Sequence, residues 1–307
     1  MKIGIPRSFL YYKYKYLWET FFKEIGCEII LSPPTNKQIL KEGVDNSIDE
    51  SCLSAKIYMG HVKWLIGKCD YILVPRIDNF GREDKVCTKF NAMYDIIKNT
   101  YEDARLLDYN IDHIRGHREY KGFMGMGKIL GKTRTKTVRS YKEALRVARF
   151  EKTRKAKQQD ELVETTDKLK ILVVAHPYNT YDKLVGEPII KYIEKLDAVP
   201  IYADVVSTKI SRKKYNELSK ELYWVYNKEL VGAIEHYKNK IAGIMFVTTF
   251  PCGPDSMVNE LCIRKIKDIP MVNIVLDELQ GEAGLHTRIE SFIDIIRERT
   301  KSSNLRR

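Results

Sequence analysis

Short apolar runs alternate with amphipathic segments along most of the chain, and this pattern predicts an α/β fold. In the first half, the predicted elements are a strand at 2–6, a helix at 9–25, a strand at 27–31, a helix at 54–66 and a strand at 69–75. Gly26 and Gly67 are placed to end the two helices. Thr35 or Asn36 is placed to cap the helix that follows the second strand. Strands that alternate with helices indicate a parallel sheet.

The second half of the chain shows the same alternation without repeating the sequence. Its predicted elements are a strand at 170–175, a helix at about 188–196, strands at 200–202, 242–248 and 271–276, and a last helix at about 285–299. A chain of 307 residues is long enough for two domains that each bury a core. We therefore expect two α/β domains with parallel sheets.

A strongly basic segment separates the two halves. Residues 115–157 hold 15 Lys or Arg against three Glu, so their net charge of +12 equals that of the whole chain. The segment has no strand pattern, only four glycines between 122 and 131 and then a charged helix from about Ser140. The expected organisation is an N-terminal α/β domain at 1–114, a basic connector and helix at 115–168, and a C-terminal α/β domain at 169–307.

The N-terminus and the apolar runs indicate where the protein resides. Met1 to Pro6 leads at once into Arg7 and a tyrosine-rich stretch, without the basic, apolar and small-residue order of a secretory leader. The longest apolar runs, such as 241–250, are far shorter than the roughly 20 residues that cross a bilayer. We expect a cytoplasmic protein with no membrane contact, whose six cysteines stay reduced rather than forming disulfides.

Three of the six cysteines stand where a parallel α/β sheet usually carries function, in loops beyond strand ends or at helix starts. Cys52 opens the helix at 54–66, Cys87 follows the strand at 69–75, and Cys252 follows the strand at 242–248 and precedes Pro254. The N-terminus of a helix stabilises a thiolate and favours metal binding, which applies to Cys52 and Cys252. The other interpretation is that these are buried structural thiols, and the spacing alone does not decide between the two.

Zinc and the other three cysteines fit this site less well. Structural zinc usually takes ligand pairs at C-x2-4-C spacing, and the sequence contains no such pair. Cys27 and Cys69 stand at strand starts, opposite the expected site, and are interpreted as core residues. Cys262 lies on the helix after Cys252, about 15 Å further along the axis, which argues against one metal centre bound by both.

Several motifs resemble one known family over nearly the whole chain. They are Lys2 to Tyr12, Ser32 to Lys37, Asp49 to Cys52, Val74 to Arg76, Val86 to Phe90, Pro251 to Ser256 and Gly281 to Gly284. The chain resembles the acyl-CoA dehydratase activase-related proteins, a family similar to the 2-hydroxyacyl-CoA dehydratase D-component, the benzoyl-CoA reductase subunits and the double-cubane cluster proteins. The pattern of three cysteines is the most specific part of the resemblance.

The resemblance implies two Rossmann-like domains with an oxygen-sensitive 4Fe-4S cluster, or a larger double-cubane cluster, in a cleft between them. The cluster ligands would be Cys52, Cys87 and Cys252. An ATP-dependent iron-sulfur activase would supply low-potential electrons, and this chain would act as a reductase, dehydratase or electron-transfer component, in a homodimer or a heterodimer. No P-loop of the type G-x-x-x-x-G-K-[ST] is present, so the use of ATP would belong to the partner.

Some positions depart from the family pattern, and others are weaker candidates for function. Ser54 and Thr88 stand near positions where prolines are expected, and Leu279 stands where a histidine is common. His176, in a motif that ends at Asp182, is expected either to line the cleft or to cap and pack its loop. Asp277 and Glu282, which stand near Gly281 and Gly284 in the sequence, are candidates for an acid or base in the cleft. The other interpretation is that these carboxylates cap the following helix.

Two further functions compete with the electron-transfer interpretation. One is a non-catalytic accessory or scaffold protein that binds the activase or carries a cluster. The other assigns the basic segment to nucleic acid, through the neutralisation of phosphates. Single-strand binding favours aromatic side chains, and they are sparse in this segment, limited to Tyr120, Phe123, Tyr141 and Phe150. We therefore rank nucleic acid below an acidic partner or anionic groups such as CoA phosphates as the ligand of the basic segment.

Overall fold

The computed structural model describes residues 1–279 and 281–304, and only the backbone at 282, 303 and 304. It divides into two compact units. The first comprises 1–153 together with Tyr223–Val225, and the second comprises 154–222 together with the described residues from 226 onward. The domain boundaries expected at 114 and 168 stay predictions, as does the cleft between the domains.

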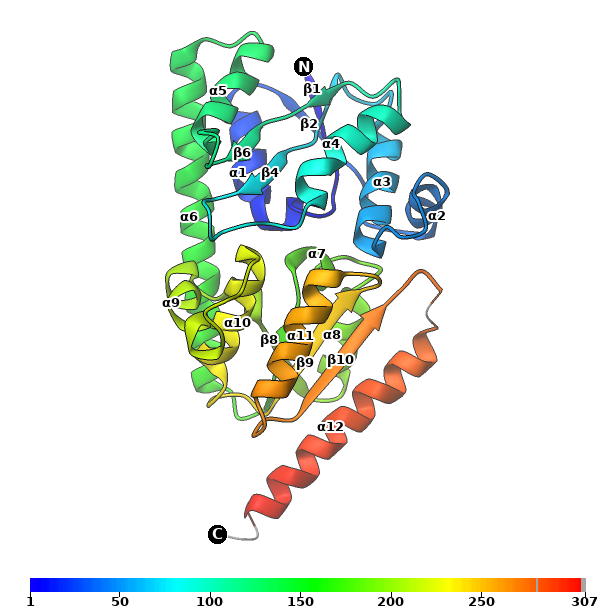
Figure 1. Ribbon diagram of the computed structural model, residues 1–307, viewed down its shortest axis with the longest axis vertical. Coiled ribbons are helices and arrows are strands. Elements are labelled where there is room, and N and C mark those ends of the chain that lie inside the picture. Colours follow the sequence, from blue (N-terminus) through cyan, green and yellow to red (C-terminus); the bar gives the residue numbers. More distant parts are fainter. Residues whose placement is uncertain (280, 305–307) are drawn as a thin grey trace. The chain divides into compact units, whose positions relative to one another are not determined.

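The first unit is built on a parallel sheet of four strands in the order β2-β1-β3-β5, beside a two-stranded parallel sheet of β4 and β6 (Figure 1). Its elements are β1 (Lys2–Ile5), α1 (Tyr11–Glu24), β2 (Glu28–Leu31), α2 (Lys37–Asp45), α3 (Leu53–Leu65), β3 (Tyr71–Leu73), β4 (Arg76–Asn79), α4 (Lys89–Thr100), β5 (Leu106–Leu107), β6 (Asn110–Asp112) and α5 (Glu119–Ile129). Ile3 and Ile5 of β1 are fully buried, so the centre of this sheet lies in the core.

The second unit is built on another parallel sheet of four strands, in the order β10-β9-β7-β8. Its elements are β7 (Leu169–Val174), α7 (Pro177–Thr180), α8 (Glu187–Lys195), β8 (Ala198–Tyr202), the short 3-10 helix η1 (Ala203–Val205), α9 (Thr208–Leu218), α10 (Val225–Tyr237), β9 (Gly243–Thr249), α11 (Gly253–Lys265), β10 (Met271–Leu276) and α12 (Glu282–Asn304). In Figure 1, α11 lies across β9, and α12 packs on α8 and β10.

The two sheets share one strand order. In each, the first strand of the unit is flanked by the second strand on one side and the third on the other, with a fourth strand beyond the third. The prediction of an α/β fold with parallel sheets, as in two Rossmann-like domains, is therefore confirmed. A doubly wound sheet binds ligands where the strand order reverses, which here is between β1 and β3 and between β7 and β9.

The helix α6 (Arg134–Thr165) differs from the sequence prediction. It begins six residues before Ser140, because Thr133 caps it: the Lys136 amide donates to the Thr133 hydroxyl at 3.3 Å, and the Thr137 amide to the Thr133 carbonyl at 3.0 Å. The boundary between the two units falls inside this helix, after Thr153. The basic stretch before α6 also contains α5, which the sequence pattern did not predict.

Candidate functional site

Cys52 is the N-cap residue of α3, as the sequence predicts. The amides of Ala55 and Lys56 donate to its carbonyl oxygen at 2.8 and 3.1 Å, so the half-exposed thiol stands at the N-terminus of the helix. The position of α3 is set by a close crossing with α2. A Cβ atom at Gly43 would lie 1.9 Å from the carbonyl oxygen of Lys56, and one at Gly60 equally close to that of Ile39. Only glycine permits this approach.

Cys87 lies in the loop before α4, next to the loop that carries Cys52. The amide of Phe90 donates to the Cys87 carbonyl at 3.0 Å, and the ammonium of Lys89 donates to the Ser51 hydroxyl at 3.3 Å. This second contact joins the residue before Cys52 to a residue two positions after Cys87. The structure therefore places these two loops side by side within the first unit.

Aromatic side chains fill the point where the strand order of the first sheet reverses. Phe9, in the loop after β1, stacks on Tyr58 of α3 with 5.0 Å between ring centroids and meets Phe90 of α4 edge-on at 5.4 Å. Its φ angle of 47° is a left-handed conformation that bulky residues rarely adopt. The remaining cavity measures about 10 Å³, roughly the space of one water molecule. Phe9 thus packs against both helices that follow the cysteine loops.

A buried histidine ties the loops after β1 and β2 to α3. The ring nitrogens of His61 hydrogen-bond to the Ser32 hydroxyl at 2.8 Å and to the Thr35 hydroxyl at 3.0 Å, and the amide of Arg7 donates to the Ser32 hydroxyl at 2.7 Å. Burial, with the nearby positive charge of Arg7 as a second cause, lowers the pKa of His61 to about 3. The imidazole is therefore neutral at pH 7 and serves as a structural hydrogen-bonding group.

Cys252 is the N-cap residue of α11 in the second unit, also as predicted. Three residues later, the buried carboxylate of Asp255 collects hydrogen bonds from three other elements. It pairs with His176 after β7 at 2.9 Å, and it accepts from Asn227 of α10 at 2.8 Å and from Thr248 of β9 at 3.0 Å. The network lies where the strand order of the second sheet reverses and anchors the helix that begins at Cys252.

The electrostatics of this network favour the ionised carboxylate. Burial, the largest single effect, raises the pKa of Asp255, but the charge of His176 and the hydrogen bonds from His176, Asn227 and Thr248 together lower it below its usual value. His176 is only 5% exposed and stacks on Tyr178. Of the two roles expected for His176, its contacts in this unit match the packing role.

The other three cysteines lie in surroundings that disfavour the thiolate. Burial raises the pKa of the Cys27 and Cys69 thiols, and it raises the pKa of Cys262, which is fully buried on α11, to about 12. The Sγ atom of Cys69 packs against β1, since a Cβ atom at Gly4 would lie 2.5 Å from it. These contacts agree with the interpretation of Cys27 and Cys69 as packing residues and add Cys262 to them.

The donor chemistry at Cys52, Cys87 and Cys252 suits an iron-sulfur cluster, because such clusters are held by cysteine thiolates and the N-terminus of a helix favours the thiolate. All six cysteines lie in the described part of the chain, and none of them forms a disulfide. Among the described residues, no three or more His, Cys, Asp or Glu side chains form a group that could hold a metal ion. Cys52 and Cys87 belong to the first unit and Cys252 to the second.

Comparison with known proteins identifies the family. Residues 2–206 match the family described as "CoA enzyme activase uncharacterised domain (DUF2229)". The chain belongs to this family. The matched range includes Cys52, Cys87 and His176, whereas Cys252 and Asp255 lie beyond it. The expectation of an activase-related protein is thereby confirmed at the level of a CoA enzyme activase-type domain.

The other two comparisons add no function to this family assignment. No curated protein matches the chain. Among solved structures, it is similar to ZnuA at 12% identity and a TM-score of 0.28, with 97% of this chain and 98% of ZnuA covered. A 138–173 deletion mutant of ZnuA with zinc bound gives 12% identity and a TM-score of 0.28, with 96% of each chain covered. At this TM-score the likeness supports no inference.

Several residues in the family motifs take roles that sequence alone did not assign. Asp255 stands in the motif around Cys252, but its partner His176 is 79 positions away, and only the meeting of two parallel strand ends could have suggested the pair. Asp277 accepts the amide of Leu279 at 2.8 Å, as in a turn, and Leu279 is 89% exposed. The side chain of Glu282, the other acid or base candidate, lies outside the described residues.

A groove of about 790 Å³ runs along the first turns of α6 within the first unit. It is lined by Glu24, Arg134, Thr135, Val138, Arg139, Lys142, Glu143 and Arg146. Arg146 forms a bidentate pair with Glu143 at 2.6 and 2.9 Å, and Arg139, Lys142 and Arg146 are all exposed. The basic segment of the sequence therefore presents a groove with a positive charge excess.

No helix among the described residues is long and apolar enough to span a membrane.

Proposed function

We propose that this chain is an iron-sulfur protein of the 2-hydroxyacyl-CoA dehydratase and benzoyl-CoA reductase type. In this proposal it accepts low-potential electrons from an ATP-dependent activase and acts as a reductase or electron-transfer component. The observation that carries the proposal is the division of the six cysteines into two classes. Cys52, Cys87 and Cys252 are half-exposed beside helix starts, whereas Cys27 and Cys262 are buried, and Cys69, although half-exposed as well, lies before the strand β3 and not at a helix start.

In the proposed function, two of the ligand cysteines, Cys52 and Cys252, are each positioned by the packing of the helix that follows. The crossing at Gly43 and Gly60 holds the start of α3, and Asp255 holds the start of α11. A bound cluster would supply one-electron chemistry at low potential. The gathering of the three thiols around one cluster, of the 4Fe-4S or double-cubane type, is itself part of the proposal.

Iron and sulfide analysis tests the proposal directly. Protein purified without oxygen is expected to contain iron and acid-labile sulfide in comparable amounts, because dispersed thiolates suit a cluster better than a lone zinc ion. Both elements are measured per chain, together with the visible absorption of the protein before and after exposure to air. A preparation that holds zinc and no sulfide would contradict the cluster.

One observation favours the alternative of a non-catalytic accessory or scaffold protein. Phe9, Tyr58 and Phe90 fill the ligand-binding point of the first sheet and leave about 10 Å³, which is too little for a substrate. A reductase or dehydratase would need its substrate site elsewhere. Assays of the pure, iron-loaded protein with an activase and acyl-CoA substrates separate the two functions, because an accessory protein would turn over none of them.

The activase is the expected partner, and the basic groove on α6 is its proposed docking surface. Reversing the charges of Arg139 and Lys142 to glutamate is expected to weaken binding of an activase of the 2-hydroxyacyl-CoA dehydratase type by about tenfold, since each exposed charge contributes up to about 1 kcal/mol. Binding should also weaken as salt is raised, because exposed charges are screened over about 8 Å at physiological ionic strength. Titrations of binding at rising salt measure both effects.

A glutamate at Lys136 is the matched control for this docking surface. Lys136 is exposed on α6 but does not line the groove. Its reversal changes the net charge of the helix without changing the groove, so it should reduce binding much less. Equal losses in the two variants would show a general charge effect rather than a docking groove. Tight, sequence-selective binding of nucleic acid would overturn the ranking of partners.

A further inference from the structure

A three-residue segment, Tyr223–Val225, packs in the first unit although the residues on both sides of it in the sequence belong to the second. We refer to this segment as the strap. Trp224 pairs with Lys85 in a parallel β-bridge, and the amide of Val225 donates to the Lys85 carbonyl at 2.8 Å. Lys85 stands two residues before Cys87. The strap therefore contacts the cysteine loop through the backbone.

The Lys85 backbone is the middle of three short extended segments. On one side it pairs with Asn79 in an antiparallel bridge, and on the other side it pairs with Trp224. The next residue, Val86, is buried, and its amide donates to the Asp78 carbonyl at 3.2 Å. The chain leading into Cys87 is thus held between the end of β4 and the strap.

The amide of Val225 requires a hydrogen-bond acceptor from outside α10. Val225 is the first residue of α10, and the first four amides of a helix have no acceptor within the helix. Val225 is also fully buried, so water does not serve as the acceptor. The carbonyl of Lys85, which lies in the same unit, satisfies this donor.

We propose that the strap is a positioning element for Cys87 and acts through the hydrogen bond from Val225 to Lys85. Without it, the loop would keep its link to β4 but lose the restraint on its other side, and the Cys87 thiol would move more freely. The role of the strap in cluster binding rests on the proposed function. The restraint that the strap places on the Cys87 loop can be measured in iron-free protein.

Replacing Val225 with proline tests the hydrogen bond. Proline removes the amide donor, yet it is well suited to the first position of a helix, and the extended backbone that it requires of the preceding residue is already present in the bridge at Trp224. The matched control is Val225→Ala, which removes more of the side chain but keeps the donor. A role in packing alone would make the alanine variant the more disturbed of the two.

The readout is the rate at which a maleimide modifies Cys87 relative to Cys52 in the same iron-free, reduced molecules, determined by peptide mass spectrometry. The proline variant is expected to raise this ratio about fivefold, the factor that corresponds to one hydrogen bond, while the alanine variant leaves it near the wild-type value. An unchanged ratio in the proline variant, or equal increases in both variants, would overturn the proposal.

Two further measurements complete the test. Iron per chain in anaerobic preparations should fall in the proline variant and not in the alanine variant. If the wild-type protein contains no iron, the proposed function fails, while the modification ratio still decides the role of the strap. If the proline variant does not fold, hydrogen exchange of the wild-type protein decides: the Val225 amide should be protected like the interior of α10, and exchange as fast as at exposed Tyr223 would refute the restraint.

Discussion

Serine in place of Cys52, Cys87 or Cys252 is expected to remove most of the iron from the protein while leaving the fold largely intact. Serine is a poor cluster ligand, and each of the three side chains is half-exposed, so little packing is lost. Serine at Cys27 or Cys262 is expected to keep the iron but to lower the free energy of unfolding by about 1 to 3 kcal/mol, because a hydroxyl would be buried among apolar atoms.

Iron per chain and the visible charge-transfer spectrum, measured across all six single variants, separate these two classes. Cys69 should behave like Cys27, since burial raises the pKa of both thiols. Cys262 distinguishes the kinds of cluster: a loss of iron in its serine variant would mean that a larger double cluster is present and that Cys262 helps to hold its second half. Full retention of iron in the variants of Cys52, Cys87 and Cys252 would refute the ligand assignment.

Alanine in place of Asp255 is expected to lower the free energy of unfolding of the second unit by about 3 to 5 kcal/mol. The change leaves the donors of His176, Asn227 and Thr248 buried without their common acceptor. Asparagine at this position keeps one acceptor oxygen, and its variant should lose less of the free energy of unfolding.

The pKa of Asp255 is lower in the folded chain than in the unfolded chain. The contribution of its ionised carboxylate to stability is therefore present at neutral pH and is lost as the pH falls below the unfolded pKa of 3.8.

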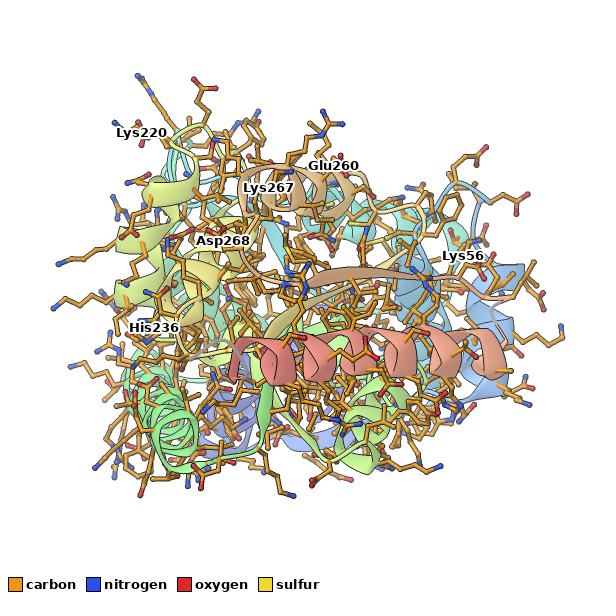
Figure 2. The ribbon with its side chains drawn as sticks, turned by 90° about the horizontal axis from the view of Figure 1, so that it is seen from below. Lys56, Lys220, His236, Glu260, Lys267 and Asp268 are labelled. Carbon is orange, nitrogen blue, oxygen red and sulfur yellow. The ribbon has the colours of Figure 1, made fainter. Side chains whose placement is uncertain are left out.

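Hydrogen exchange of the β7 and β9 amides at pH 7 measures this effect in the second unit. Tryptophan fluorescence serves as an internal reference, because Trp18, Trp64 and Trp224 all lie in the first unit. Glu260 provides the matched control. It lies on the exposed face of α11, where Figure 2 labels it, and pairs with Arg264 at 2.6 Å. Its alanine variant should change stability by about 0.5 kcal/mol at most, and equal effects of the two variants would contradict the anchoring role.

The sequence predicted three strands of the second sheet best. The bounds of β7 and β9 differ from the prediction by one residue, because continuous apolar runs mark strands covered on both faces, and β9 is buried along its whole length. The bounds of the edge strand β10 agree with the prediction, although this strand is only partly buried and its Val275 is exposed. The short strands β4 and β6 have the sequences RIDN and NID, in which no apolar period is visible. Their pairing depends on residues more than 30 positions apart and could not be predicted from the local pattern.

Glycines misled the sequence prediction at α5 for a physical reason. Four glycines in ten residues are typical of a loop, yet Gly122 and Gly127 lie in a helix. A Cβ atom at Gly122 would lie 2.7 Å from Tyr109, and one at Gly127 would lie 2.3 Å from Thr137. Here glycine permits close packing between elements, and a single sequence cannot distinguish this from a need for flexibility.

At the candidate site, local features were predicted and long-range ones were not. The positions of Cys52 and Cys252 at helix starts follow from the residues next to them, and the structure confirms both. The hydrogen bonds of Asp255 and of the Val225 amide join residues 79 and 140 positions apart, and no local pattern encodes either contact. The role of the three cysteines as ligands of one cluster stays a prediction.

The course of the chain limits how this protein can be divided for study. It passes from the first unit to the second inside α6, returns for the three residues of the strap, and passes over again within α10. A cut after Thr153 would sever a continuous helix and would also leave the Lys85 carbonyl without its donor from Val225. A fragment of the first unit therefore needs residues 223–225 joined back to it, by circular permutation or as a separate peptide, before its folding says anything about the intact chain.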